Sequence, residues 1–185
     1  MGKKWLIMPF ILVVMFVIFL LININKPKPK SDYFINQTNM KISSPAFQNN
    51  ETIPARYTCD SDNINPPLYF EDVPEGTKSL VLIVDDPDAP SSTFLHWLVF
   101  NIPPETKLIE ENSVPLGAKL GKNDFGKIGY GGPCPPYGIH RYYFKLYALN
   151  KELDLAEGSL LSEVLAAMKN NVLGESYLIG LYKHQ

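Results

Sequence analysis

The 185-residue sequence lacks the features that mark several specialised classes of protein. No segment recurs with a period of about 20 to 50 residues, which excludes repeat architectures. All 19 acidic residues, but only 12 of the 17 basic ones, lie after residue 30. Nucleic-acid binding requires a basic surface, and an acidic domain does not offer one. We therefore expect one globular domain with a real core and no nucleic-acid partner.

Histidine and cysteine are also scarce, with three and two residues respectively. The histidines do not follow one another at a close metal-ligand spacing such as His-x-x-x-His, so no resident metal or cofactor is indicated. An even pair of cysteines, Cys59 and Cys134, permits a disulfide if the domain is exported. Two cysteines can also stay as free thiols, and the sequence leaves both states open.

The N-terminal segment contains an uncharged apolar run at residues 5–24. A helix of this length spans about 30 Å, the thickness of a bilayer core. A signal peptide has a shorter apolar region and a small-residue cleavage site, and no Ala-x-Ala follows here. We therefore predict a transmembrane anchor at residues 1–25, with an uncleaved signal as the alternative, then a Pro/Lys linker at 26–38 and a domain at 39–185.

Charges beside this run predict its orientation. Lys3 and Lys4 favour a cytoplasmic N-terminus, although three lysines on the far side, at positions 26, 28 and 30, oppose it. The expected location is a single-pass membrane protein, in contact with the membrane through residues 5–24, with its folded domain on the extracytoplasmic (periplasmic) side.

Apolar runs bounded by Pro, Gly, Asn and Asp predict strands in the rest of the chain. The clearest runs are residues 80–84, 94–104 (ending at Pro103 and Pro104), 141–150 and 176–183, with weaker candidates at 40–47 and 53–59. One helix is expected at residues 159–173, where apolar residues recur with helical spacing and Ser159 is a plausible N-cap. Helices do not alternate with the strands, so we predict a mainly β, antiparallel sandwich with this short helix packed on it.

Polar residues interrupt these apolar strands at particular places. Alternation puts His140 and Tyr142 on one face, at the polar end of a strand whose later residues are apolar. A proline-stiffened turn presents Asp86 and Asp88. His96 follows in an otherwise apolar strand and needs a polar partner if it is buried. Each feature alone has an ordinary structural explanation, but together they favour a pocket where the sandwich opens.

Three segments, NINPPLYFEDVPEGTKSLVLIVDDPDAP, HWLVFNIP and GYGGPCPPYGIHRYYFKLYAL, occur in this order. Together they resemble the phosphatidylethanolamine-binding protein family, also called Raf kinase inhibitor protein-like, over residues 47–182. The short link between Pro90 and His96 is similar to the bacterial branch. The resemblance implies a small anion-binding pocket that is lined or supported by Asp86, Asp88, His96, Gly131, Gly132, His140 and Tyr142.

The resemblance also implies a function, namely a non-enzymatic ligand-binding or regulatory domain. Its ligand would be a small anion or a phospholipid headgroup, and eukaryotic members modulate kinases or proteases by binding. Imidazole and phenol groups donate hydrogen bonds to oxygens, and free glycine N–H groups can form an anion-holding nest. The alternative is a hydrolase or metal-dependent enzyme that uses the same pocket, with His96 as a base oriented by Asp86. Its nucleophile would have to come from the nearby Ser91, Ser92 or Cys134.

Overall fold

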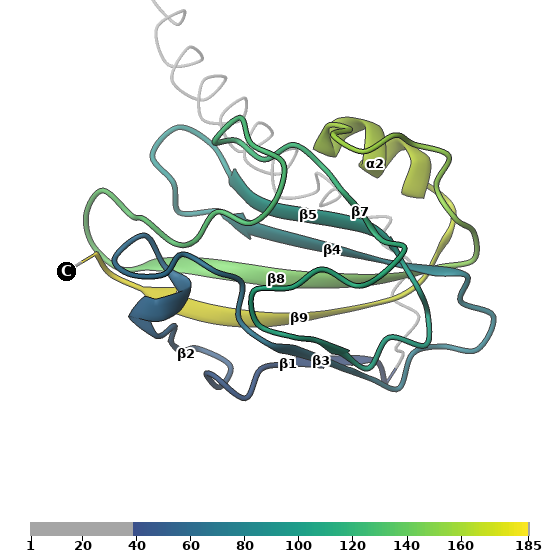
Figure 1. Cartoon of the computed structure of the whole chain (residues 1–185), viewed down its shortest axis with the longest axis horizontal. Helices are drawn as coiled ribbons and strands as arrows, with labels where there is room; N and C mark the ends of the chain where they lie inside the picture. The colour runs from purple at the N-terminus through teal and green to yellow at the C-terminus, as the bar shows by residue number, and fades with distance from the viewer. Residues whose placement is uncertain (1–38, 185) are drawn as a thin grey trace, which may run out of the picture. The chain divides into compact units, whose positions relative to one another are not determined.

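The computed structural model describes residues 39–184, which form two β-sheets packed face to face (Figure 1). The larger sheet has the order β2 (Glu51–Thr52), β9 (Val172–Tyr182), β8 (His140–Leu149), β4 (Ser79–Asp86), β5 (Phe94–Ile102) and β7 (Lys119–Leu120). The smaller sheet has the order β1 (Lys41–Ser43), β3 (Leu68–Glu71) and β6 (Leu108–Ile109). All pairs are antiparallel except β2 with β9. The predicted mainly β sandwich is confirmed.

The central strands β4 and β5 are buried on both faces, because an apolar layer covers each side of the larger sheet. One layer lies between the two sheets and includes Leu82, Trp97 and Phe144. The other lies between the larger sheet and the helix α2 (Leu161–Met168), which covers this face in Figure 1, and it includes Val164 and Met168. This double burial explains why β4 has an unbroken apolar run instead of the alternation of a half-exposed strand.

Strand register brings the predicted polar residues to one end of the larger sheet. Asp85 pairs with Tyr143, so Asp86 at the end of β4 lies beside the beginning of β8. The pairing of β4 with β5 shifts between Val84 and Asp85, and His96 lies in β5 at this irregularity. Bulges of this kind redirect side chains next to functional sites. The local fold therefore brings Asp86, His96 and His140 together from the three adjacent strands β4, β5 and β8.

Two predicted elements differ from the structure. The helix is shorter than residues 159–173, and Leu160, not Ser159, holds its N-cap position. Asn170 has a φ of 64°, a left-handed conformation that Asn tolerates, so the chain leaves the helix there and enters β9. The expected strand at 53–59 contains instead the 3₁₀ helix η1 (Ala55–Tyr57).

The membrane prediction needs a correction. Within residues 39–184, no helix combines the length and the apolar character that crossing a membrane requires. This finding overturns the predicted single-pass membrane location. The apolar run at residues 5–24, on which that prediction was based, and the expected anchor and linker at 1–25 and 26–38 lie outside the described residues.

Candidate functional site

A buried hydrogen bond between a histidine and an aspartate forms the centre of the candidate site. The Nδ1 of His140 lies 2.7 Å from Oδ2 of Asp86, and both side chains are only 5% exposed. The other oxygen of Asp86 accepts the backbone N–H of Asp88 at 2.8 Å. Because Nδ1 is the atom that faces the carboxylate, it donates its hydrogen, and Asp86 fixes the orientation of the imidazole.

His96 lies in the same region but has a different partner. Its Nδ1 is 2.7 Å from the carbonyl oxygen of Gly131, which can only accept, so Nδ1 carries the hydrogen. Burial lowers the pKa of His96, although the Gly131 contact and the charge of Asp86 oppose this effect. The neutral ring therefore has a lone pair at Nε2. The expected pairing of His96 with Asp86 as base and orienter is not what the structure has.

Tyr142 completes the group. It is fully buried, its ring centroid lies 5.2 Å from that of His96, and its hydroxyl lies near Asp86 and the backbone of Cys134 without a hydrogen bond of good geometry to either. Burial raises the pKa of Tyr142, and the nearby charge of Asp86 raises it further. A buried hydroxyl without a partner is costly, which makes it a strong candidate for a ligand contact. We call Asp86, His96, His140 and Tyr142 the oxyanion cluster.

Asp88 has a supporting position at the edge of this group. Its carboxylate accepts hydrogen bonds from Nε and from a terminal nitrogen of Arg141, at 2.8 and 2.6 Å, and from the Arg141 backbone N–H at 3.0 Å. The hydrogen bonds from Arg141 lower the pKa of Asp88 to about 2. The turn after β4 is thereby attached to the beginning of β8.

Gly131 and Gly132 do not offer the free N–H groups expected of a nest. Gly131 donates to the carbonyl of His96 at 3.0 Å, and Gly132 donates to Oδ1 of Asn63 at 2.7 Å. Neither has a positive φ. Position 131 favours glycine because there is little room for a side chain: a Cβ at Gly131 would lie 2.5 Å from the ring of Phe125. Both glycines line a cavity of about 110 Å³.

The two cysteines lie next to this glycine loop. Cys59 and Cys134 form a disulfide with an S–S distance of 2.11 Å and a Cα–Cα distance of 5.4 Å. The backbone N–H of Cys59 also donates to the carbonyl of Pro133 at 3.0 Å. The bond leaves Cys134 without the thiol that a nucleophile needs, and Ser91 and Ser92 lie in an exposed turn.

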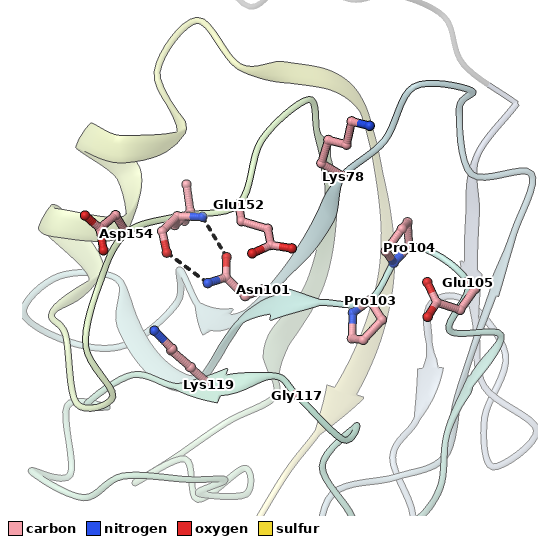
Figure 2. A pocket seen from close by; sticks show the side chains of 10 residues that line it. Lys78, Asn101, Pro103, Pro104, Glu105, Gly117, Lys119, Glu152 and Asp154 are labelled. Atoms are coloured by element: carbon pink, nitrogen blue, oxygen red, sulfur yellow. Dashed lines mark hydrogen bonds between the residues drawn. The ribbon is translucent and has the colours of Figure 1, made fainter.

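A larger cavity, of about 570 Å³, lies near the opposite ends of β4 and β5 (Figure 2). Asn101 has a φ of 53° there, and its side-chain amide exchanges two hydrogen bonds with the backbone of Leu153. Charges of both signs line it, from Lys78, Lys119, Glu105, Glu152 and Asp154. Sequence reasoning did not find this cavity, because its lining comes from short segments that share no motif.

Comparisons with known proteins agree with this fold. The sequence model of the family described as phosphatidylethanolamine-binding protein matches residues 43–183. A UPF0098 protein of Methanothermobacter thermautotrophicus is 52% identical over 149 residues, which covers 78% of this chain and 99% of the relative. A UPF0098 protein of Aquifex aeolicus is 51% identical, with 78% of this chain and 88% of the relative covered.

Solved structures give the same result. The Chlamydia trachomatis protein CT736, described as a phosphatidylethanolamine-binding protein homologue, has a TM-score of 0.76 and 40% identity, covering 79% of this chain and 98% of its own. Escherichia coli YbcL, described as a member of the mammalian PEBP family, has a TM-score of 0.74 and 31% identity, covering 79% and 99%. The family name describes binding, and the name UPF0098 assigns no enzyme activity. The resemblance predicted from the sequence is confirmed, and this chain belongs to the phosphatidylethanolamine-binding protein family.

Proposed function

We propose that this chain is a binding protein that takes up a small oxyanion, such as a phosphate group or a phosphorylated headgroup, at the oxyanion cluster. The observation that carries the proposal is the hydroxyl of Tyr142, which is buried and makes no hydrogen bond of good geometry within the described residues, although Asp86 and the backbone of Cys134 lie near it. Beside it lies the buried pair of His140 and Asp86. An oxyanion accepts hydrogen bonds, so the phenol can donate to it through a group that the protein itself leaves unsatisfied.

The protonation of His96 sets the pH dependence of this binding. Neutral His96 has its hydrogen on Nδ1, toward Gly131, so Nε2 can only accept. A fully ionised oxyanion also only accepts, and the two lone pairs would repel each other. One proton must therefore enter the complex, either on Nε2 or on the ligand. Because burial lowers the pKa of His96, we expect binding to strengthen as the pH falls toward 6.

Calorimetric titration with inorganic phosphate and with phosphorylethanolamine tests this proposal. Tyr142→Phe removes one hydroxyl, and Tyr143→Phe is the matched control because Tyr143 points to the opposite face of β8. A hydrogen bond to a charged group contributes about 1.5 kcal/mol or more, so Tyr142→Phe should weaken binding about tenfold or more. Titrations in buffers with different ionisation enthalpies should show uptake of about one proton.

The same variant separates a ligand contact from a structural role. Because the hydroxyl makes no hydrogen bond of good geometry, replacing it with a hydrogen should leave the stability of the ligand-free protein nearly unchanged. Equal affinities of the wild type and Tyr142→Phe would refute the assignment. Equal affinities for the two ligands would show that the phosphate group alone is recognised. We include no kinase, protease or other protein partner in the proposal, because nothing in residues 39–184 identifies one.

A further inference from the structure

A second group of reactive side chains surrounds the disulfide, and none of its members belongs to the oxyanion cluster. Cys59, Cys134 and His184 each present a ligand atom, and these atoms lie within 4.8 Å of one another. The Sγ of Cys59 and the Nδ1 of His184 are 3.9 Å apart. In a tetrahedral zinc site with bonds of about 2.3 Å to sulfur and 2.0 Å to nitrogen, such ligands are roughly 3.6 Å apart. The sulfur–nitrogen spacing is thus close to that of a metal site.

A carboxylate lies beside the same nitrogen of His184. Its Nδ1 lies 2.6 Å from Oδ1 of Asp60, and the second oxygen of Asp60 accepts a hydrogen bond from the hydroxyl of Tyr182. Tyr182 is buried at the end of β9, so it holds the carboxylate in place. Asp60 faces Nδ1, the same nitrogen that would bind the metal, so it does not have the place of an orienting carboxylate, which holds the other ring nitrogen. Carboxylates also serve as zinc ligands, so once the metal replaces the hydrogen on Nδ1, Asp60 is a candidate for a fourth position.

We propose that reduction of the Cys59–Cys134 disulfide creates a zinc site formed by Cys59, Cys134 and His184, with Asp60 as the fourth donor. A dithiol reductant supplies two electrons and two protons, which convert the disulfide to two thiols while the reductant becomes a disulfide. The metal then displaces the two thiol protons and binds the thiolates. In the oxidised chain the sulfurs are bonded to each other, and the site does not bind zinc.

The donor set selects the metal. Two thiolates and an imidazole suit Zn²⁺, whereas Ca²⁺ and Mg²⁺ prefer oxygen ligands. The site is also accessible, since Cys134 and His184 are exposed and Cys59 is half-buried. Opening the disulfide requires the sulfurs to separate to about 3.8 Å, the distance between two sulfur ligands on one tetrahedral zinc ion. A rotation of the two cysteine side chains, which lie in loops, can provide this movement.

As a consequence, the zinc ion would replace the disulfide as the cross-link at this end of the sandwich. The disulfide joins the segment after η1 to the loop before β8, and His184 adds the segment after β9. A zinc ion at this position would hold the same three segments together when the disulfide is reduced. The chain would then keep this end of the sandwich closed under both oxidising and reducing conditions.

Cobalt titration of the full-length protein tests the proposal. The protein is reduced with dithiothreitol, freed of reductant by desalting without oxygen, and titrated with Co²⁺ and then with Zn²⁺. We expect one Co²⁺ per reduced chain, with thiolate charge-transfer absorption and the visible bands of tetrahedral cobalt, which Zn²⁺ then abolishes. The oxidised chain should show neither. Reduced protein without thiolate absorption, or equal binding by both forms, would overturn the proposal.

Variants identify the ligands. His184→Ala should weaken Zn²⁺ affinity at least tenfold in a competition with a chelator, and Asp60→Asn should weaken it less. Asp62→Asn is the matched control, because Asp62 is exposed and pairs with Arg56 instead. Zinc should also slow reoxidation of the thiols in the wild type but not in His184→Ala. Undiminished affinity in His184→Ala would contradict the site, as would a reduced chain that loses its β-sheet circular dichroism and does not recover it with zinc.

Discussion

At the scale of single residues, the three histidines show that environment decides what an imidazole does. His140 faces a carboxylate, His96 faces a backbone carbonyl, and His184 faces both a carboxylate and a disulfide sulfur. Burial lowers the pKa of His96, and the carbonyl of Gly131 leaves its neutral ring only one tautomer. This constraint affects stability as well as binding.

We predict that His96 lowers the stability of the ligand-free protein at acidic pH. Above about pH 6.5 the residue is neutral in both states and contributes no pH dependence. Below that value the unfolded chain binds a proton that the folded chain does not, because the folded pKa is lowered. The free energy of unfolding should then fall with decreasing pH by up to about 1.4 kcal/mol per unit from this residue.

Urea unfolding of the wild type and His96→Asn at several pH values measures this effect. The Asn side-chain amide can still donate a hydrogen bond to the carbonyl of Gly131, but it does not titrate. The difference in unfolding free energy between the two proteins should therefore change between about pH 6.5 and pH 5, in favour of the variant. Parallel curves for the two proteins would show that His96 has an ordinary pKa.

At the scale of elements, the loop before β8 is packed against the segment that contains η1. A Cβ on Gly132 would lie 2.6 Å from the backbone oxygen of Tyr57 and 2.8 Å from Cα of Thr58. A Cβ on Gly131 would instead meet the ring of Phe125, which is 43% exposed and can turn aside. The two glycines therefore differ in what must move when a side chain is added.

This difference predicts an order of stability. Gly132→Ala forces two backbone segments apart and should cost about 2–3 kcal/mol, within the range for overpacking. Gly131→Ala displaces one flexible ring and should cost about 1 kcal/mol. Chemical denaturation of the two variants against the wild type measures both values. A larger loss for Gly131→Ala would mean that Phe125 is fixed more firmly than its exposure suggests.

The same elements show how much of the fold could be predicted from the sequence. The long strands β4, β5 and β8 were found because an apolar run or an alternating face extends over many residues. The two-residue strands β2, β6 and β7 have no such pattern and exist only through pairing with distant segments. The helix was predicted too long because Val172 continues the apolar spacing, although it already belongs to β9.

The motifs indicated which polar residues lie close together, but not which groups they hydrogen-bond. The motifs named Asp86, His96, His140 and Tyr142, and the structure brings these four together. The partner of His96 is a carbonyl 35 residues away, which no spacing rule indicates. The acceptor for the N–H of Gly132 is likewise 69 residues away, at Asn63. Hydrogen-bond partners of this kind depend on how loops pack, and the sequence does not encode that locally.

At the scale of the whole molecule, the disulfide connects two segments that lie far apart in the sequence. Cys59 and Cys134 are separated by 75 positions, and β3, β4, β5, β6 and β7 lie between them. Closing so long a loop restricts the unfolded chain strongly. The described part of the chain nevertheless has two apolar layers of its own, and a domain of this size does not require a disulfide to fold.

We therefore predict that the double variant Cys59→Ser/Cys134→Ser folds but is less stable. The chain-entropy treatment gives a loss of about 4.5 kcal/mol for a loop of this length, mainly through a more expanded unfolded state. Urea unfolding in the presence of a chelator should show a lower midpoint and a steeper denaturant dependence, because the unfolded variant exposes more surface. Reduced wild-type protein under the same conditions should match the variant. If the double variant were as stable as the oxidised wild type, the cross-link would not constrain the unfolded chain, and the stability would have to come from the two apolar layers alone.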